Sequence, residues 1–144
     1  MLKRIDLKWN GFLQSYAGLT EAAMKEPGVV GDWSVKDILA HVTTWEDETL
    51  KSLPVLMEGR RMPLYGGVDR FNARQSALKR SLPLDRVLSQ LGDTHQRLIA
   101  FLKTVPEEHL RTETRVRRRL RLDTYSHYPE HAGSIQQWRA ARGI

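Results

Sequence analysis

Two histidines near the carboxyl end of the chain, His127 and His131, stand four residues apart. On a helix, residues at this spacing project from one face about one turn apart, so both imidazoles can bind the same ion. Catalytic metal sites need a third protein ligand and an open position for water or substrate. His41 is the natural third ligand, because it lies on the apolar stripe of an earlier predicted helix and bundles build metal sites across facing helices. The spacing therefore predicts a three-histidine metal site.

Other histidines leave alternatives open. A histidine on an apolar stripe is more often a hydrogen-bonded core residue than a ligand. His95 also lies on such a stripe, and we interpret it as a core or boundary residue that could replace or join His41 in the site. His109 stands beside Pro106 and two glutamates, which favours a surface position. The chain has no cysteine, so thiolate ligands and disulfides are excluded.

A divalent ion at this site would supply either a water of lowered pKa for hydrolysis or a bound thiolate or substrate oxygen for transfer chemistry. Asp37 lies four residues before His41 and is either an orienting partner of that imidazole or a charge at a helix start. Glu46 and Glu130 are acid–base candidates because they neighbour the predicted site in sequence. Both are equally compatible with solvent-facing positions.

Two aromatic residues, Trp45 and Tyr128, are candidates for lining a pocket, although aromatic residues at helical spacing are more often core residues. No serine-nucleophile motif is present, and the pair Gly66-Gly67 does not form a phosphate-binding loop. The sequence therefore gives no support for nucleotide chemistry.

The first predicted helix precedes His41, and the second contains it. Apolar residues recur at three- and four-residue steps from Ile5, and we expect this helix to stop before Pro27. Ser34 is the predicted N-cap of the second helix, with Asp37 beside its positive end. Pro54 and then Gly59 should kink or end that helix.

The later elements must carry the histidine pair. Residues 58–67 read as a loop, followed by a short helical segment that contains Phe71 and Asn72. A strongly periodic helix runs from Pro83 to Val105. Residues 111–122 show hints of a two-residue period that fit an extended segment, a loop or a frayed helix equally, so 106–122 stays unassigned. The last helix should begin with Asp123 as its N-cap, and Pro129 should kink or break its first turn.

Composition and periodicity together indicate an all-α protein: an antiparallel four-helix bundle with one extra short helical segment between its second and third main helices. The chain has 144 residues, of which 40% are hydrophobic and 28% charged, which fits one folded domain over residues 1–144. Neither a signal peptide nor an apolar run of about 20 residues is present, so we expect a cytoplasmic protein that does not enter a membrane.

The positive charge of the chain is concentrated in one segment. Between positions 111 and 121 lie six arginines and one acid, Glu113, so this segment carries +5 of the formal net charge of +6. Such a run could bind nucleic acid, with Arg117, Arg118 and Arg119 as the contacting residues, and the binding would weaken with salt. The run lacks the interleaved aromatics that favour single strands, and charge runs are usually solvated surfaces. The pattern therefore favours a solvated surface over nucleic-acid binding.

Two motifs resemble those of a known family. The first combines a helix cap, a Lys-Asp pair, His41 and a tryptophan in fixed register, and the second surrounds the histidine pair near the carboxyl end. Their sequences are DWSVKDILAH at 32–41 with Trp45-Glu46, and TYSHY at 124–128 with His131, Ile135 and Trp138. The chain resembles the DinB-like (DinB/YfiT-like) four-helix-bundle superfamily. Within it, the chain is most similar to the ClbS/DfsB-like branch (DUF1706), which also carries a Phe-Asn pair such as Phe71-Asn72.

The resemblance implies a nickel, zinc or iron ion held by one histidine from the second helix and two from the last. By position these are His41, His127 and His131, the residues that the helical faces also select. With such an ion, the site predicts a metal-dependent hydrolase or transferase that acts on a small molecule. The alternative is a metal-independent small-molecule binding or self-protection protein of the ClbS/DfsB kind. A homodimer is also implied. The arginine-rich segment departs from the family, in which a more apolar stretch is expected before the last helix.

Overall fold

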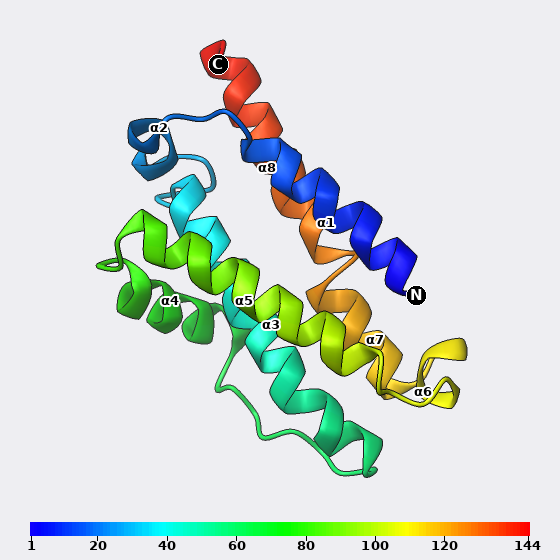
Figure 1. Cartoon of the computed structure of the whole chain (residues 1–144). Coiled ribbons are helices and arrows are strands. Elements are labelled where there is room, and N and C mark those ends of the chain that lie inside the picture. The colour runs from blue at the N-terminus through cyan, green and yellow to red at the C-terminus, as the bar shows by residue number, and fades with distance from the viewer.

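The computed structural model describes residues 1–144 and is all-α (Figure 1). One isolated β-bridge joins Val30 and Trp33. None of the helices combines the length and hydrophobicity needed to cross a bilayer. The helices are α1 (Leu2–Tyr16), α2 (Glu21–Lys25), α3 (Val35–Met57), α4 (Val68–Lys79), α5 (Leu84–Leu102), α6 (Glu108–Arg111), α7 (Arg115–Asp123) and α8 (His127–Arg142).

The bundle consists of two pairs of long helices, α1 with α8 and α3 with α5 (Figure 1). Within each pair the helices run parallel. Asp47 of α3 contacts Arg97 of α5, and Lys36 near the start of α3 contacts the carbonyl of Arg80 just before α5. The two pairs run antiparallel to each other, and α3 faces the α7–α8 segment. Parallel neighbours need a long connection, and the segment 58–83, which contains α4, returns the chain to the start of α3.

The amino-terminal half differs from the sequence prediction at one break. A single helix was predicted to reach Pro27, but α1 ends at Tyr16 and a separate short helix, α2, follows. Gly18 takes a left-handed conformation with φ of 78°, and the Thr20 side chain then accepts the amide of Ala23 as a new N-cap. The break lets the chain turn toward α3.

Helix α3 begins as predicted, with Ser34 as its N-cap. The Ser34 hydroxyl accepts from the amide of Asp37, and the Asp37 carboxylate accepts from the amide of Ser34, which completes a capping box. Pro54 does not end the helix, which continues to Met57 before Gly59 turns the chain with φ of 78°.

The carboxyl-terminal part differs more. The unassigned segment 106–122 forms α6 and most of α7, and Thr114 caps α7 by accepting the amide of Arg117. Asp123 was predicted to cap the last helix; this was wrong, because Asp123 is the last residue of α7 and its carboxylate binds Arg119 and Thr49 instead. Pro129 is the third residue of α8, where an amide has no partner inside the helix, so the predicted broken turn is also absent.

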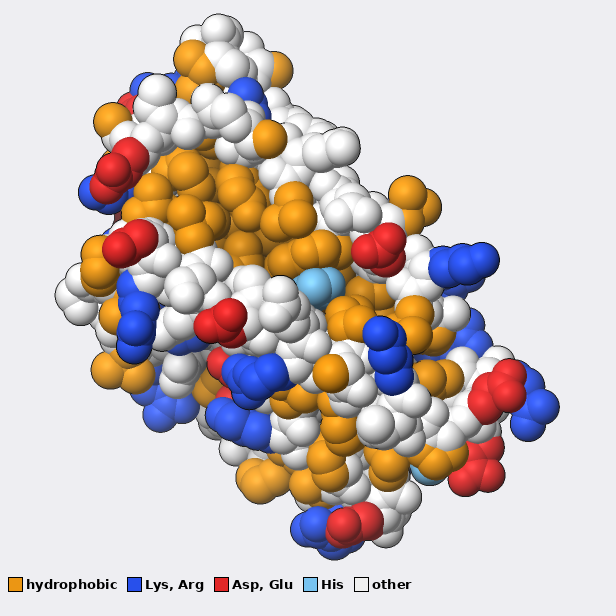
Figure 2. All heavy atoms as spheres, viewed as in Figure 1, with side chains coloured by type: hydrophobic (Ala, Val, Ile, Leu, Met, Phe, Trp, Pro, Cys, Tyr) orange, Lys and Arg blue, Asp and Glu red, His pale blue; other side chains and the backbone are white.

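A single hydrophobic cluster fills the bundle, with side chains from α1, α2, α3, α5, α7 and α8. Figure 2 shows hydrophobic side chains gathered in a hollow between α1 and α5. Phe71 of α4 lies outside this cluster and packs instead on the rings of Trp45 and Tyr65, 5.3 and 4.8 Å away between ring centroids. Helix α4 and the loop before it therefore cover one side of α3, next to the histidines.

Candidate metal centre

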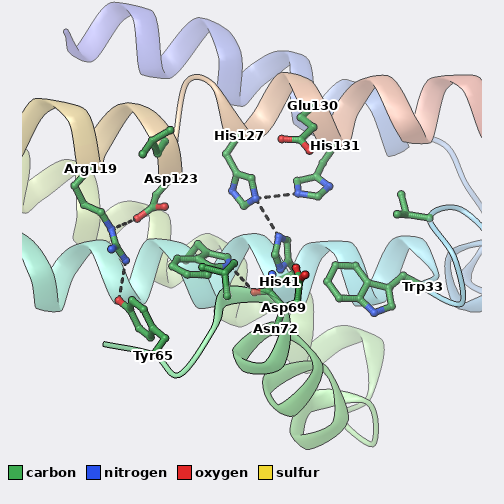
Figure 3. A pocket seen from close by; sticks show the side chains of 14 residues that line it. Trp33, His41, Tyr65, Asp69, Asn72, Arg119, Asp123, His127, Glu130 and His131 are labelled. Atoms are coloured by element: carbon green, nitrogen blue, oxygen red, sulfur yellow. Dashed lines mark hydrogen bonds and ion pairs between the residues drawn. The ribbon is translucent and has the colours of Figure 1, made fainter. Parts of the chain in front are cut away.

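Three histidines from two helices point their Nε2 atoms toward one another. His41 projects from the second turn of α3, and His127 and His131 project from the first turns of α8 (Figure 3). The Nε2 atom of His127 lies 3.0 Å from Nε2 of His41 and 2.9 Å from Nε2 of His131. The i, i+4 spacing on α8 supplies two of these nitrogens, and the antiparallel packing of α3 on α8 supplies the third.

The donor set fits a metal ion better than a set of hydrogen bonds. A neutral Nε2 atom carries either one proton or one lone pair, so His127 cannot make a good hydrogen bond to both neighbours at once. Two imidazoles bound to one ion at about 2.1 Å would place their nitrogens about 3.0 Å apart at a right angle and about 3.4 Å apart at a tetrahedral angle. The observed separations of 2.9 and 3.0 Å are close to the first value.

Burial keeps these imidazoles neutral. It lowers the pKa of His41 to about 2, with a further contribution from the neighbouring His127 and His131, and it lowers the pKa of His127 to about 3. The pKa of His131 is lowered as well, again chiefly by burial. The Nδ1 atoms of His127 and His131 are buried without a hydrogen-bond partner. Neutral imidazole is the form that binds metals, so the site needs no deprotonation before an ion can bind.

The three histidines line one end of a pocket of about 720 Å³ (Figure 3). Its walls come from α3, α4, α7, α8 and the loops before α3 and α4. Three of its apolar residues are exposed at 42–55% of their surface: Val30, Val68 and Leu122. Trp33 packs beside His41, with 4.8 Å between the ring centroids. The pocket therefore combines an apolar wall with a cluster of imidazole nitrogens.

The other end of the pocket holds one fixed cation. Arg119 Nε donates to the carboxylate of Asp123 at 2.5 Å, and its Nη2 donates to the hydroxyl of Tyr65 at 2.9 Å. The guanidinium also lies over the rings of Trp45 and Tyr65. Asp123 is held from behind by the hydroxyl of Thr49 at 2.7 Å. Arg119 is the one Lys or Arg side chain that lines this pocket, and its neighbours fix its orientation.

Of the other residues that the sequence suggested for the site, some line the pocket and others lie in the core. Trp45 lines the pocket, where its indole donates to the side-chain oxygen of Asn72 at 2.8 Å. Glu130 also lines the pocket and is exposed, with its side chain beside His131. Glu46 and Tyr128 do not reach the pocket, because both are fully buried in the bundle core. Asp37 binds Ser34 in the capping box.

The two further histidines lie outside the cluster. His95 is buried in the core, with Nδ1 2.9 Å from Glu46 Oε1 and its ring stacked on Trp9. His109, on α6, is partly exposed and 3.8 Å from the carboxylate of Glu108. His95 therefore neither replaces nor joins His41 in this arrangement.

Several pocket residues were missed by sequence reasoning. Tyr65 lies in the loop before α4 and Asp69 in the first turn of α4, and no local sequence pattern predicts that either lies near His41. The pair Arg119 and Asp123 stands at helical i, i+4 spacing, which is a recognisable signal for a charge pair. It could have been found if residues 115–123 had been recognised as a helix.

Half of the six arginines between positions 111 and 121 bind partners within the protein, and the other half are exposed. Arg117 donates to the carbonyls of Leu110 and Arg111, and Arg121 pairs with Glu113 at 2.8 Å. Arg119 belongs to the pocket. Of the three arginines predicted as nucleic-acid contacts, Arg118 alone is exposed.

The bundle and the histidine cluster together define a class of small helical proteins with a candidate metal centre between facing helices. The chain belongs to the DinB superfamily, whose family model matches residues 4–134. No curated protein is significantly similar in sequence.

Solved structures share the fold at low sequence identity. The colibactin self-resistance protein ClbS, crystallised in complex with double-stranded DNA, superposes with a TM-score of 0.80 at 16% identity, over 94% of this chain and 90% of that one. An uncharacterised protein from Escherichia coli UTI89 superposes with a TM-score of 0.82 at 13% identity, over 99% of this chain and 92% of that one. A protein from Streptococcus pneumoniae superposes with a TM-score of 0.78 at 14% identity, over 96% of this chain and 87% of that one. At these identities the likeness is one of fold.

Proposed function

We propose that the chain is a metal-dependent hydrolase or transferase that acts on a small molecule. His41, His127 and His131 would hold a divalent nickel, zinc or iron ion. The observation that carries the proposal is a cluster of three neutral imidazoles at the edge of a pocket of about 720 Å³. In this cluster the Nε2 atom of His127 lies 3.0 Å from that of His41 and 2.9 Å from that of His131. Pockets of roughly 300–1,000 Å³ are typical of small-molecule sites.

When bound, such an ion would act as a Lewis acid that polarises a substrate oxygen or thiol, or lowers the pKa of a water molecule. The surrounding residues suggest the other roles. The apolar wall of Trp33, Val68 and Leu122 would bind the body of the substrate and exclude water. Arg119, which its neighbours hold in place, would donate a hydrogen bond to an acceptor group at the far end of the substrate. Glu130, exposed beside the histidines, would accept or return a proton.

Metal analysis tests the proposal. Protein purified without a histidine tag should contain about one transition-metal ion per chain after growth with ample metals. His127→Ala should lose the ion, and the matched control His109→Ala should keep it, because His109 lies outside the cluster. Metal-free wild-type protein from such cultures would reject a metalloenzyme.

A metal-independent self-protection protein is the second candidate, favoured by the shared fold with ClbS. The two candidates predict different results in a survival assay. If the chain protects a sensitive bacterium against colibactin or another reactive natural product, and His127→Ala protects equally well, the metal has no part in that function. Loss of protection in His127→Ala but not in His109→Ala would instead connect protection to the histidine site.

Nucleic-acid binding is a weaker alternative. ClbS has been crystallised with double-stranded DNA, which motivates the test. Arg117, Arg119 and Arg121 are engaged internally, so DNA contacts would depend on the exposed Arg111, Arg115 and Arg118. Retardation of a DNA duplex at low salt that disappears when these three become Ala would support binding. No retardation at low salt rejects it.

A further inference from the structure

A cluster of buried polar side chains joins the four long helices. The carboxylate of Glu46, on α3, is fully buried, and its Oε1 atom accepts a hydrogen bond from the hydroxyl of Tyr128 on α8. The same oxygen lies 2.9 Å from Nδ1 of His95 on α5. The His95 ring stacks on Trp9 of α1 with 3.6 Å between centroids and 3° between planes.

This cluster is costly to bury, which argues that it does more than fill space. A carboxylate and a phenol in an apolar core lose hydration that only well-placed hydrogen bonds can replace, and the Oε2 atom of Glu46 has no partner at all. A pair of apolar side chains could pack α8 on α3 without these costs.

The position of Tyr128 in the chain gives the cluster a connection to the metal centre. Tyr128 is the second residue of α8 and directly follows His127. The first turn of α8 comes after the three-residue connection 124–126, and its N-cap, Ser126, makes no side-chain hydrogen bond. The amides of His127 and Tyr128 donate to the carbonyl of Thr124 instead, so the capping contacts of this turn stay within the α7–α8 segment and do not tie it to α3. His127 and Tyr128 are neighbours on one helical turn and project about 100° apart. A rotation of this turn that displaced the Tyr128 hydroxyl would therefore also swing His127 away from His41.

We propose that Glu46 and Tyr128 are positioning residues for the three-histidine site. Their hydrogen bond holds the first turn of α8 at one rotation and height on α3, and so brings the Nε2 atoms of His127 and His131 to that of His41. A hydrogen bond serves this purpose better than apolar contact because it is directional and tolerates little displacement. The inference rests on the proposed function in one respect, which is that the histidines bind a metal.

The test compares two buried tyrosines, Tyr125 within the α7–α8 connection and Tyr128 just after it. Tyr128→Phe removes the hydroxyl that binds Glu46, whereas Tyr125→Phe removes a buried hydroxyl that has no partner. Affinity for Ni²⁺ is measured by titration calorimetry well below the unfolding temperature. Tyr128→Phe should weaken binding about tenfold, the lower end of the range for residues that orient metal ligands. Tyr125→Phe should bind as the wild type does.

A second pair of variants separates positioning from stability. Glu46→Gln keeps an oxygen that can accept from Tyr128, and Glu46→Leu removes it. We expect Glu46→Gln to recover most of the Ni²⁺ affinity that Glu46→Leu loses. The visible absorption bands of Co²⁺-loaded protein provide a second measurement. They should shift in Tyr128→Phe and Glu46→Leu but not in Tyr125→Phe.

The outcomes are distinguishable. If Tyr128→Phe melts at a lower temperature but binds Ni²⁺ with wild-type affinity and gives the wild-type Co²⁺ spectrum, the cluster is a stability feature and the positioning role is overturned. If the wild-type protein itself binds no Ni²⁺, the metal site fails and this inference falls with it.

Discussion

The Nε2 atom of His41 on α3 lies 3.0 Å from the Nε2 atom of His127 on α8, although 86 positions separate the two residues in sequence. Their neutral state follows from burial, and His131 completes the cluster from the next turn of α8. Three lone pairs directed into one small space repel unless a proton or a metal ion lies between them. This arrangement underlies the proposed function and the predictions below.

Metal binding should release few protons. At pH 6, three imidazoles with the ordinary pKa of 6.5 would together release about two protons when an ion binds. Here the pKa values of His41 and His127 are about 2 and about 3, and that of His131 is also lowered, so the imidazoles are already neutral. Calorimetric titration with Ni²⁺ in buffers of different ionisation enthalpy should give less than about half a proton per ion. Release of about two would mean that the folded site is protonated.

The same pKa shifts predict how the stability of the metal-free protein changes with pH. Because the pKa of His41 is lower in the folded state, the unfolded chain binds more protons below about pH 6.5, and the free energy of unfolding should fall as the pH drops. For His41 alone the loss between pH 7.5 and pH 5 is about 2 kcal/mol. Urea denaturation should therefore show a weaker pH dependence for His41→Gln than for the wild type. Equal pH dependence would show that His41 is not buried as a neutral imidazole.

The role of Asp37 can be separated from the metal site. Its carboxylate completes the capping box with Ser34, so Asp37→Ala should lower the free energy of unfolding by about 1 kcal/mol and leave metal content unchanged. Asp32→Ala, at an exposed acid of the loop before α3, is the control and should change neither. A variant Asp37→Ala that keeps its stability but loses metal would support the orienting role for His41 instead.

The ion pair of Arg119 and Asp123 predicts a stability effect in the pocket wall. Arg119→Met leaves the buried Asp123 carboxylate without its cation, which should cost about 3 kcal/mol in urea denaturation. Arg118→Met, at the exposed neighbouring position, should stay within about 0.5 kcal/mol of the wild type. Adding Asp123→Asn to Arg119→Met should restore part of the loss by removing the buried charge. If Arg119→Met and Arg118→Met are equally stable, the pair contributes little.

The histidine cluster was predictable from sequence because helical periodicity carries directional information. The i, i+4 spacing of His127 and His131 and the place of His41 on an apolar stripe define which way each side chain points once the helices pack. Whether these residues bind a metal stays a prediction. The all-α bundle, the loop 58–67 and the short helix α4 were also predicted, and the structure confirms them.

What the sequence did not reveal depends on contacts between distant segments. Asp123 has the residue type of an N-cap, and only the positions of Arg119 and Thr49 show why its carboxylate is used elsewhere. Glu46 is a charged residue for which a solvent-facing position was equally plausible, and its burial follows from Tyr128 on α8 and His95 on α5. Neither partner can be assigned before the relative placement of three helices is known.

Anomalous X-ray diffraction from crystals soaked in Ni²⁺ tests the central claim most directly, because it locates the ion and its ligands together. We predict one anomalous peak per chain, about 2.1 Å from the Nε2 atoms of His41, His127 and His131. Crystals that show no peak between these three atoms, or a peak only at another site, would contradict the account.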